Sequence, residues 1–428
     1  METWKNCSCA KKAPQLEVNE EVSDAYVNKP PLPRQYAESL LVMEEGRGCR
    51  ISDRAGREYL DMGAGIAVNS LGYGRSDLAE IAAEQMRKLI HVSNLFTTGP
   101  AVELAEKIIS AGPPRGSKLE FEAVHFGNSG AEANETALKY ARLYSNCKRG
   151  DGHHRLLAFS GGFHGRTMGA LSLTENPQYR LPFGPLIPGV TILPLNDEQA
   201  LRDTLDESFA AVIIEPIQGE GGLHKPDKNF ARALNSLCRQ YDVLLIADEI
   251  QSGLGRCGEL YASSLLGLEP DIITLAKPLA AGLPLSAVLI PSRVNRLLKP
   301  GFHATTFGGG PLTTAIASAA WDLLTDPILM KEVSRKGLFL ESLLKEGLWK
   351  LGIPGEIRGI GMLRGLRLRG GKYDSSWCSK VLRKALDAGL IILKSGSNVL
   401  RLAPPLVISD DELAEGTRIL FNTLKGTI

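Results

Sequence analysis

The sequence lacks long hydrophobic runs, and no run reaches the ~20 apolar residues that a membrane-spanning helix needs. It also lacks an excess of charge, since 49 lysine and arginine residues are balanced by 48 aspartate and glutamate residues. A balanced charge gives no reason to expect nucleic acid or an anionic membrane as a partner. The N-terminal residues contain no apolar stretch of the kind found in secretory signals, and Glu17, Glu20 and Glu21 argue against an arginine-rich transit peptide. We therefore expect a cytoplasmic protein.

Cysteine is sparse as well. The seven cysteines are scattered, no CxxC occurs, and Cys7 and Cys9 are too isolated to form half of a zinc site. We expect reduced thiols and no metal centre. The GxxxxGK[ST] sequence of P-loop nucleotide-binding proteins is also missing. The length of 428 residues and the hydrophobic fraction of 43% are those of an ordinary globular protein of roughly two to three domains.

Short apolar runs alternate with helical patterns between about residues 120 and 290. The runs cover residues 123–126, 156–159, 211–214, 243–246 and 272–275. Apolar runs without polar alternation indicate strands that are covered on both faces. Strands separated by helices favour a mostly parallel sheet with right-handed crossovers, and ligands of such sheets bind at the carboxyl ends of the strands. The sequence therefore predicts an α/β fold with its site at that edge.

The two ends of the chain have a different pattern. Residues 1–34 are polar, contain three prolines near their end and are expected to form a loosely docked arm. From about residue 320 the chain has helical segments and short apolar runs, and Ser409 with Glu412 forms a capping box that opens a final helix. We expect a smaller α+β domain made of residues 35–65 and 320–428, and a large domain made of residues 66–319.

Two loops at predicted strand ends have candidate binding residues. Residues 128–131 (Asn-Ser-Gly-Ala) join a strand to a helix, where backbone N–H groups and a serine hydroxyl suit a phosphate. A simple capped turn is the alternative. In residues 161–167, Phe163 could stack on a flat ring and Arg166 could hold a carboxylate through two hydrogen bonds. A tight turn with a core phenylalanine and a surface arginine is the alternative there, and His164 is expected to be structural.

Three charged residues follow later strands of the predicted sheet. Glu215 opens a glycine-rich loop at residues 215–222, where it could face a substrate or solvent. Asp248 ends a buried apolar run, and a buried carboxylate needs a cationic partner, which could be a protonated pyridine nitrogen, a metal or a salt bridge. Lys277 ends the next run, where burial would lower its pKa as an imine-forming amine requires.

These candidates have one economical explanation. A phosphate site, a stacking ring, an acid for a ring nitrogen and an imine-forming lysine are what pyridoxal phosphate needs. The chain resembles the class III (subgroup II) aminotransferases of pyridoxal-phosphate fold type I. The resemblance extends over about residues 35–425 and rests on segments in the order 129–135, 163–167, 215–220, 248–253, 275–279, 305–309 and 401–406.

The resemblance implies roles toward the cofactor. Lys277 would form the imine with pyridoxal phosphate and move the substrate proton, while Asp248 would keep the pyridine nitrogen protonated. Phe163 would stack on the ring, and Gln251 would hydrogen-bond its phenolic oxygen. The phosphate would be bound by Ser129, Gly130 and Ala131. Thr306 would reach the phosphate of the neighbouring subunit's cofactor, so the expected assembly is a homodimer with shared active sites.

The resemblance also implies how two substrates share one site. Arg166 would hold the carboxylate far from the reacting amine, and Arg401 would hold the α-carboxylate of glutamate or 2-oxoglutarate. Glu220 would pair with Arg401 while an ω-amino donor is bound, because an unpaired buried arginine is costly.

Within the family, residues 65–72 and 91–100 are most similar to the branch that acts on acetylornithine in arginine biosynthesis. The tail at residues 401–408 resembles the ornithine branch equally well, and succinylornithine and 4-aminobutyrate are further candidate donors. Tyr73 stands where the family often has histidine, and Pro311 follows two glycines where Gly-Gly-Asn-Pro is common. The same pattern could also belong to an aminomutase of this fold, against which Arg166 argues, or to a relative without enzyme activity.

Overall fold

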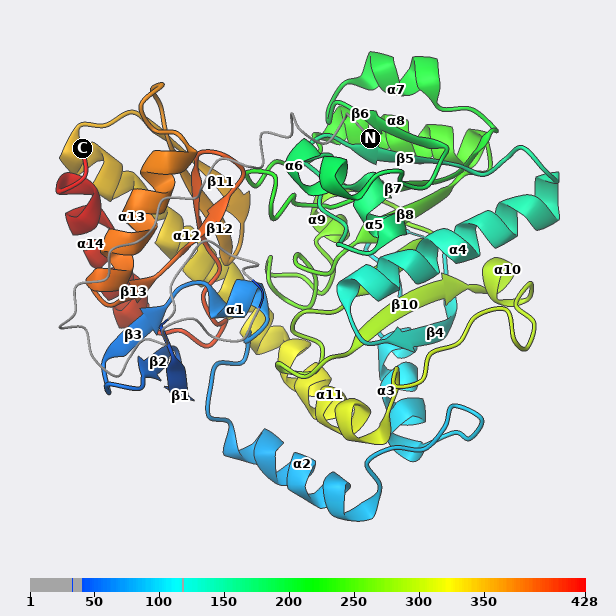
Figure 1. Ribbon diagram of the computed structural model, residues 1–428, viewed down its shortest axis with the longest axis horizontal. Coiled ribbons are helices and arrows are strands. Elements are labelled where there is room, and N and C mark those ends of the chain that lie inside the picture. The colour runs from blue at the N-terminus through cyan, green and yellow to red at the C-terminus, as the bar shows by residue number, and fades with distance from the viewer. Residues whose placement is uncertain (1–32, 34–40, 118) are drawn as a thin grey trace, which may run out of the picture.

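The computed structural model describes residue 33, residues 41–117 and residues 119–428. The predicted arm at residues 1–34 therefore lies, apart from Pro33, outside the described residues. Figure 1 shows two groups of elements beside each other: a group around one large sheet, and a group of helices and smaller sheets formed by the first and last parts of the described chain.

The large sheet has seven strands. Their order is β4 (Phe121–Gly127), β10 (Ser286–Pro291), β9 (Ile272–Leu275), β8 (Leu244–Asp248), β7 (Phe209–Ile214), β5 (Arg155–Phe159) and β6 (Val190–Leu193). Strand β10 runs antiparallel to both of its neighbours, and the remaining pairs are parallel. All five predicted apolar runs lie in this sheet, so the predicted α/β fold is confirmed. Strands β6 and β10 were not expected from the sequence.

The burial of β7 explains why its sequence is apolar throughout. Ala211 and Ile213 belong to one hydrophobic cluster, together with Ala133 and Ala137 of α4 (Gly130–Arg149). Val212 and Ile214 belong to another cluster, together with residues of α8 (Lys228–Gln240). Successive side chains of a strand point to opposite faces, so a sheet covered by helices on both faces needs apolar residues at every position.

The second group contains two four-stranded sheets. One has the order β1 (Met43–Arg47), β2 (Arg50–Asp53), β3 (Glu58–Asp61) and β13 (Leu390–Ile391), and the other has the order β11 (Gly355–Ile360), β12 (Leu363–Leu368), β15 (Val399–Leu402) and β14 (Leu393–Ser395). Strands β3 and β13 pair in parallel, with Leu60 opposite Leu390. Early and late parts of the chain thus share one sheet, while the expected domain boundaries near residues 65 and 320 stay predictions.

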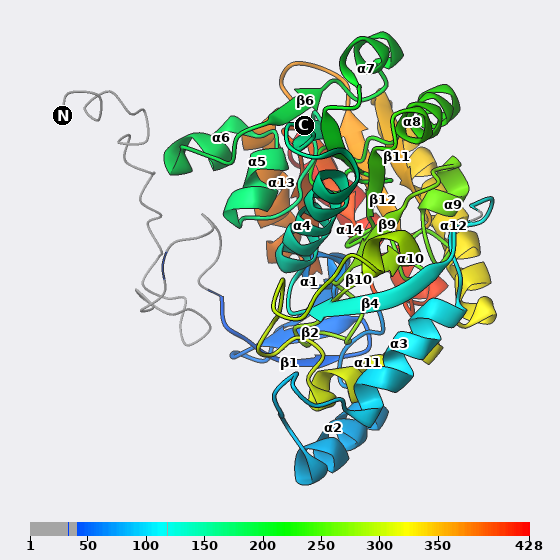
Figure 2. The same ribbon diagram turned by 90° about the vertical axis from the view of Figure 1, so that its right-hand side faces the viewer.

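Three helices accompany these sheets: α12 (Pro327–Leu351), α13 (Ser375–Asp387) and α14 (Asp410–Lys425). Helix α14 begins with the predicted capping box, in which Ser409 and Glu412 bond to each other's backbone N–H groups. Helices α2 (Ser76–Lys88), α3 (Gly99–Ser110) and α11 (Pro311–Leu324) lie together at one end of the molecule in both views (Figures 1 and 2). Among the helices of the described residues, none combines the length and the apolar character needed to cross a membrane.

The remaining helical segments are short. They are α1 (Ala64–Ala67), α5 (Met168–Leu173), α6 (Pro177–Arg180), a 3-10 turn (Leu181–Phe183), α7 (Glu198–Thr204), α9 (Ser263–Leu266) and α10 (Ser292–Asn295). Most of them connect strands of the large sheet, and the loops at the carboxyl ends of these strands contain most of the predicted site residues, whereas Arg401 lies in β15.

Candidate active site

The carboxyl ends of β8 and β9 bring the two central candidates together. These strands are parallel neighbours, with Asp248 opposite Thr274, so Lys277 follows just beyond the end of the shared register. Lys277 lies close enough to Asp248, Glu220 and Arg401 for each charge to influence its pKa. The predicted amine, ring acid and substrate clamp therefore share one electrostatic environment.

Burial lowers the pKa of Lys277 below its ordinary value of 10.5. The negative charges of Glu220, Asp248 and Glu215 act in the opposite direction, and the positive charge of Arg401 adds to the lowering. A lowered pKa increases the fraction of free amine, the form that attacks a carbonyl group.

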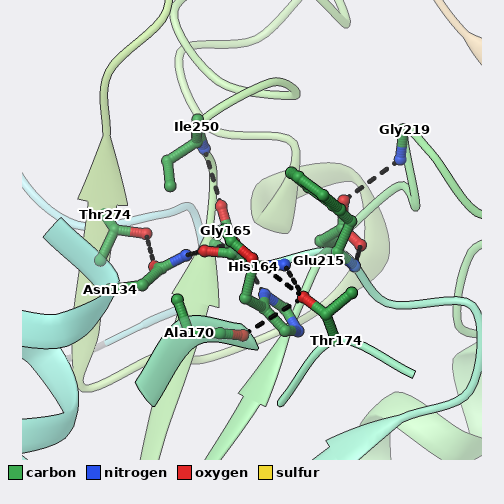
Figure 3. Close-up of polar contacts among 11 residues, drawn as sticks. Asn134, His164, Gly165, Ala170, Thr174, Glu215, Gly219, Ile250 and Thr274 are labelled. Carbon is green, nitrogen blue, oxygen red and sulfur yellow. Dashed lines mark hydrogen bonds and ion pairs between the residues drawn. The ribbon is translucent and has the colours of Figure 1, made fainter. Parts of the chain in front are cut away.

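Asp248 is 4% exposed and accepts hydrogen bonds at both carboxylate oxygens. Its Oδ2 accepts from Nδ2 of Asn134 at 2.8 Å and faces Nδ1 of His164 at 2.8 Å. Its Oδ1 accepts a single, longer bond of 3.2 Å from the backbone N–H of Ile250 (Figure 3). Within the described part of the chain no lysine or arginine forms an ion pair with this carboxylate, and its one ionisable partner is the ring of His164.

From the sequence, His164 was expected to have a structural role. In the structure its ring contacts the carboxylate of Asp248. The ring is buried, and its backbone N–H donates to Oγ1 of Thr174 at 3.0 Å. Its backbone carbonyl accepts from Asn134 at 2.7 Å. Asn134 and Thr274, a hydrogen-bonded pair at 2.9 Å, were missed by the sequence reasoning. An asparagine on the apolar face of α4, between Ala133 and Ala137, was the available signal.

Glu215 connects two loops of the site. Its Oε2 accepts from the backbone N–H of Phe163 at 3.0 Å, and its Oε1 accepts from that of Gly219 at 3.2 Å (Figure 3). Burial, followed by the negative charge of Asp248, raises the pKa of this carboxyl well above its ordinary value. Glu215 therefore points inward and does not face solvent.

The side chains of Phe163 and Arg166 share a third partner that the sequence did not reveal. The Phe163 ring is half-buried and meets the Tyr179 ring edge-on, with centroids 6.3 Å apart. The guanidinium carbon of Arg166 lies 3.6 Å from the Tyr179 centroid and 5.4 Å from the Phe163 centroid. Stacking on tyrosine holds the arginine over the loop while its N–H groups remain accessible.

Glu220 and Arg401 form an ion pair, with Oε1 of Glu220 2.6 Å from Nη1 of Arg401. The same Nη1 donates to the carbonyl of Gly219 at 2.6 Å and to Oε1 of Gln251 at 3.2 Å. A Cβ atom on Gly219 would lie 1.8 Å from Oε1 of Gln251, so this close approach requires glycine. The structure thus brings together Glu220, Gln251 and Arg401, three predicted site residues that lie far apart in the sequence.

The predicted phosphate loop forms the start of α4. Ser129 is the N-cap, and its side chain accepts from the backbone N–H of Glu132 at 3.2 Å. A Cβ atom on Gly130 would lie 2.8 Å from the side chain of Ile250, so the helix can begin against this loop only with glycine here. The N–H groups at the start of a helix this long attract an anion. Ala131 follows in the first turn and is half-buried.

Thr306 is exposed on a surface loop, and the hydroxyl of the preceding Thr305 accepts from Nδ2 of Asn128, the first residue of the predicted phosphate loop, at 3.4 Å. The surface loop is fixed by Asn94, whose Nδ2 donates to the carbonyl of Thr305 at 2.7 Å and to that of Gly308 at 3.1 Å.

A strained turn occupies part of the segment at residues 65–72. Ala64, Gly65, Ile66 and Ala67 all have positive φ, between 48° and 64°, so α1 is a left-handed turn. Oδ1 of the buried Asp61 accepts from the N–H of Gly63 at 2.7 Å and from that of Ala64 at 2.9 Å. Left-handed backbone at a β-branched residue such as Ile66 is costly and is maintained only where surrounding contacts impose it, commonly at functional sites.

These features fit pyridoxal phosphate. The glycine-dependent start of α4 suits its phosphate, and the buried carboxylate of Asp248, whose Oδ1 accepts a single backbone bond at 3.2 Å, suits its protonated nitrogen. Lys277, with its lowered pKa, suits its aldehyde.

The comparisons with known proteins agree with this chemistry. The family model described as "Aminotransferase class-III" matches residues 32–424. The mitochondrial acetylornithine aminotransferase of Alnus glutinosa is 42% identical over 394 residues, which cover 91% of this chain and 84% of that protein. The acetylornithine aminotransferase of Neisseria meningitidis serogroup B is 38% identical over 392 residues, covering 91% of this chain and 96% of that protein.

Two solved structures are similar over nearly their whole length. The ornithine aminotransferase of Toxoplasma gondii ME49 has a TM-score of 0.85 at 32% identity, covering 92% of this chain and 93% of that chain. The N-acetylornithine aminotransferase of Stenotrophomonas maltophilia K279a has a TM-score of 0.78 at 34% identity, covering 92% of this chain and 96% of that chain.

Proposed function

Because the chain belongs to the class III aminotransferases, which depend on pyridoxal phosphate, we propose that it transfers the ω-amino group of N2-acetyl-L-ornithine to 2-oxoglutarate. The products are N-acetyl-L-glutamate 5-semialdehyde and L-glutamate, which places the reaction in arginine biosynthesis. Relatives named for acetylornithine, at 38% to 42% identity over most of the chain, support this choice of donor.

Pyridoxal phosphate, when bound, supplies an electron-withdrawing ring that stabilises negative charge on the carbon that exchanges a proton. Lys277 holds the cofactor and moves that proton, which its lowered pKa supports. Asp248 holds the proton on the ring nitrogen, and its burial strengthens this interaction. Phe163 covers the ring, and Gln251 bonds its phenolic oxygen. The phosphate is held by Ser129, Gly130 and Ala131.

The ion pair between Glu220 and Arg401 is the observation that carries the proposed two-substrate reaction. With the pair closed, the arginine is neutralised and the site accepts an ω-amino donor, whose chain has no carboxylate at this position. With the pair open, Arg401 binds the α-carboxylate of glutamate or 2-oxoglutarate. Arg166 holds the carboxylate at the other end of each substrate.

An exposed apolar patch supports the proposed homodimer. Ile90, Leu95, Phe96 and Phe307 are large, exposed side chains from two segments that meet where the rings of His91 and Phe307 lie 5.5 Å apart. Apolar groups gathered on the surface mark interfaces. Thr306 precedes Phe307 on this surface and is itself exposed, as a residue that contacts a second subunit must be before association.

Ornithine is the second candidate donor. The high structural similarity to the ornithine aminotransferase of Toxoplasma gondii favours it. The two donors differ in the acetyl group, which removes the charge of the α-amino group. The cytoplasmic location stays a prediction.

The test is a half-reaction screen. Purified holoenzyme is mixed with N2-acetylornithine, ornithine, succinylornithine or 4-aminobutyrate, and the absorbance change of the bound cofactor is followed. We expect the highest rate constant per unit concentration with N2-acetylornithine and recovery of the starting spectrum with 2-oxoglutarate. An equal or higher value with free ornithine would contradict the acetylated preference.

A further inference from the structure

The polar network behind Asp248 lies within the protein core. Thr274, Asn134 and His164 are each no more than 2% exposed, and they come from β9, α4 and the loop after β5. Figure 3 shows the hydroxyl of Thr274 pointing at the side chain of Asn134. Buried polar groups at this density require a full set of hydrogen bonds, so the donors and acceptors can be assigned.

The hydrogen-bond directions in this network have one solution. The Asn134 side chain faces two groups that only accept: the His164 carbonyl at 2.7 Å and Oδ2 of Asp248 at 2.8 Å. The amide nitrogen must therefore point at both of them. The amide oxygen then faces Thr274, whose hydroxyl donates to it at 2.9 Å. A rotated amide would direct its oxygen at two other acceptors.

The same logic fixes the proton on His164. Its Nδ1 lies 2.8 Å from Oδ2 of Asp248, which only accepts when ionised, so Nδ1 carries the hydrogen. Oδ2 thus receives two side-chain donors, whereas Oδ1 receives a single backbone donor at 3.2 Å. The carboxylate is saturated on one oxygen and has remaining capacity on the other.

We propose that Thr274 is a positioning residue: through the amide of Asn134, it holds Oδ2 of Asp248 and keeps Oδ1 oriented toward the protonated nitrogen of the cofactor. The inference rests on the role of Asp248 in the proposed function and extends it to a hydroxyl on the neighbouring strand. Thr274 acts only through Asn134: the two acceptors set the orientation of that amide, and the threonine hydroxyl, bonded to the amide oxygen, holds the side chain in place.

The alternative is that Thr274 only fills space in the sheet. Thr274→Val and Thr274→Ser separate the two roles, because valine keeps the shape without the hydroxyl and serine keeps the hydroxyl without the methyl group. Thr417→Val is the matched control: Thr417 is also buried, and its hydroxyl bonds to the Leu413 carbonyl within α14. Thr274→Ala replaces Thr274→Val if the valine variant does not fold.

Two measurements address the network apart from turnover. The first is the affinity of the apoprotein for pyridoxal phosphate by equilibrium dialysis. The second is the ¹⁵N chemical shift of ring-labelled cofactor, which reports whether the pyridine nitrogen is protonated. We expect Thr274→Val to weaken binding by about tenfold, the factor for losing one hydrogen bond that supports a charged group. Its ring nitrogen should also lose protonation at a lower pH than in the wild type.

Thr274→Ser and Thr417→Val should match the wild type in both measurements. The proposal is overturned if Thr274→Val keeps wild-type affinity and a wild-type nitrogen titration, or if serine is as damaging as valine. Neither measurement depends on the amino donor, so a failure here is distinguishable from a wrong donor, which the half-reaction screen detects by itself.

Discussion

Glu220 and Arg401 form an ion pair in which one partner is buried and the other reaches solvent. The side chain of Arg401 is 3% exposed, whereas that of Glu220 is 32% exposed. Gly219 and Gln251 also hold the arginine in place. Opening the pair therefore requires movement of Glu220, and the buried guanidinium stays where a substrate carboxylate meets it.

Removing this carboxylate should affect the two half-reactions unequally. In Glu220→Ala the guanidinium is unpaired whenever an ω-amino donor is bound, which we expect to lower kcat/KM for N2-acetylornithine by about tenfold or more. The glutamate half-reaction, in which Arg401 has a carboxylate partner, should change much less. Single-turnover kinetics with N2-acetylornithine and with glutamate measures how much the variant slows each half-reaction relative to the wild type. Glu198→Ala, which breaks an exposed pair with Arg202, is the control, and equal losses with both donors would reject the switching role.

Replacing Lys277 should remove both the covalent attachment and the proton carrier. We expect Lys277→Ala to lose at least about 100-fold in kcat, the lower range for loss of an acid–base group. Borohydride reduction followed by mass spectrometry should find the cofactor covalently attached to Lys277 in the wild type and no attached cofactor in Lys277→Ala. Lys225→Ala, which changes an exposed lysine, is the control and should keep the attached cofactor. Cofactor fixed to another lysine in the wild type would place the attachment elsewhere.

The stability of the apoprotein should depend on pH through Glu215. Burial, and then Asp248, raises the pKa of this carboxyl above its ordinary value of 4.5, so the folded state binds the proton more tightly than the unfolded chain does. The favourable contribution of Glu215 is complete below that ordinary value and is lost as pH rises toward the folded-state pKa. Glu215→Gln cannot ionise, so within this window its stability should rise relative to wild type by up to about 1.4 kcal/mol per pH unit.

Denaturant titrations of both apoproteins across this pH range measure the difference. Glu207→Gln, at an exposed position, is the control: its free energy of unfolding should follow that of the wild type across the same pH range. A stability difference between wild type and Glu215→Gln that does not change with pH would show that the carboxyl titrates normally.

A charge placed in the apolar patch should separate the subunits. Phe307 is 66% exposed, and we expect Phe307→Asp to be monomeric in sedimentation velocity and to bind pyridoxal phosphate more weakly, because Thr306 then lacks its target. Trp349→Asp changes an 80% exposed aromatic residue near the end of α12 and should remain dimeric. A dimeric Phe307→Asp would place the interface on another surface.

The sequence predicted β7, β8 and β9 well because these strands are buried at every position and their residues are apolar except Asp248 and Thr274. It did not reveal β10, whose run at residues 286–291 follows the Lys277 loop without a recognisable crossover helix. Residues 390–393 form one continuous apolar run in the sequence, although they are divided between β13 and β14, which belong to different sheets. Sheet membership is decided by partners far along the chain, which a local pattern does not encode.

The residues of the candidate site also differ in how far the local sequence reveals them. Lys277, Asp248 and the loop at residues 215–222 stand directly after apolar runs, so their place at the strand ends could be inferred. Asn134 and Thr274 lie within a helix and a strand, where neither the polar neighbours of Asn134 nor the apolar neighbours of Thr274 indicate a site. Their meaning depends on the register between β8 and β9 and on the distance from α4 to the sheet, which are three-dimensional quantities.

The parallel pairing of β3 with β13 has a consequence for how the protein is made. During synthesis Leu60 emerges from the ribosome long before Leu390, so the edge of β3 must wait for its partner until nearly all of the chain has been translated. The strands of the large sheet, and with them Asp248 and Lys277, are all available earlier. A ribosome-bound chain halted shortly before residue 390 should therefore have an assembled large sheet beside an exposed β-edge, the state in which chaperone binding and aggregation compete.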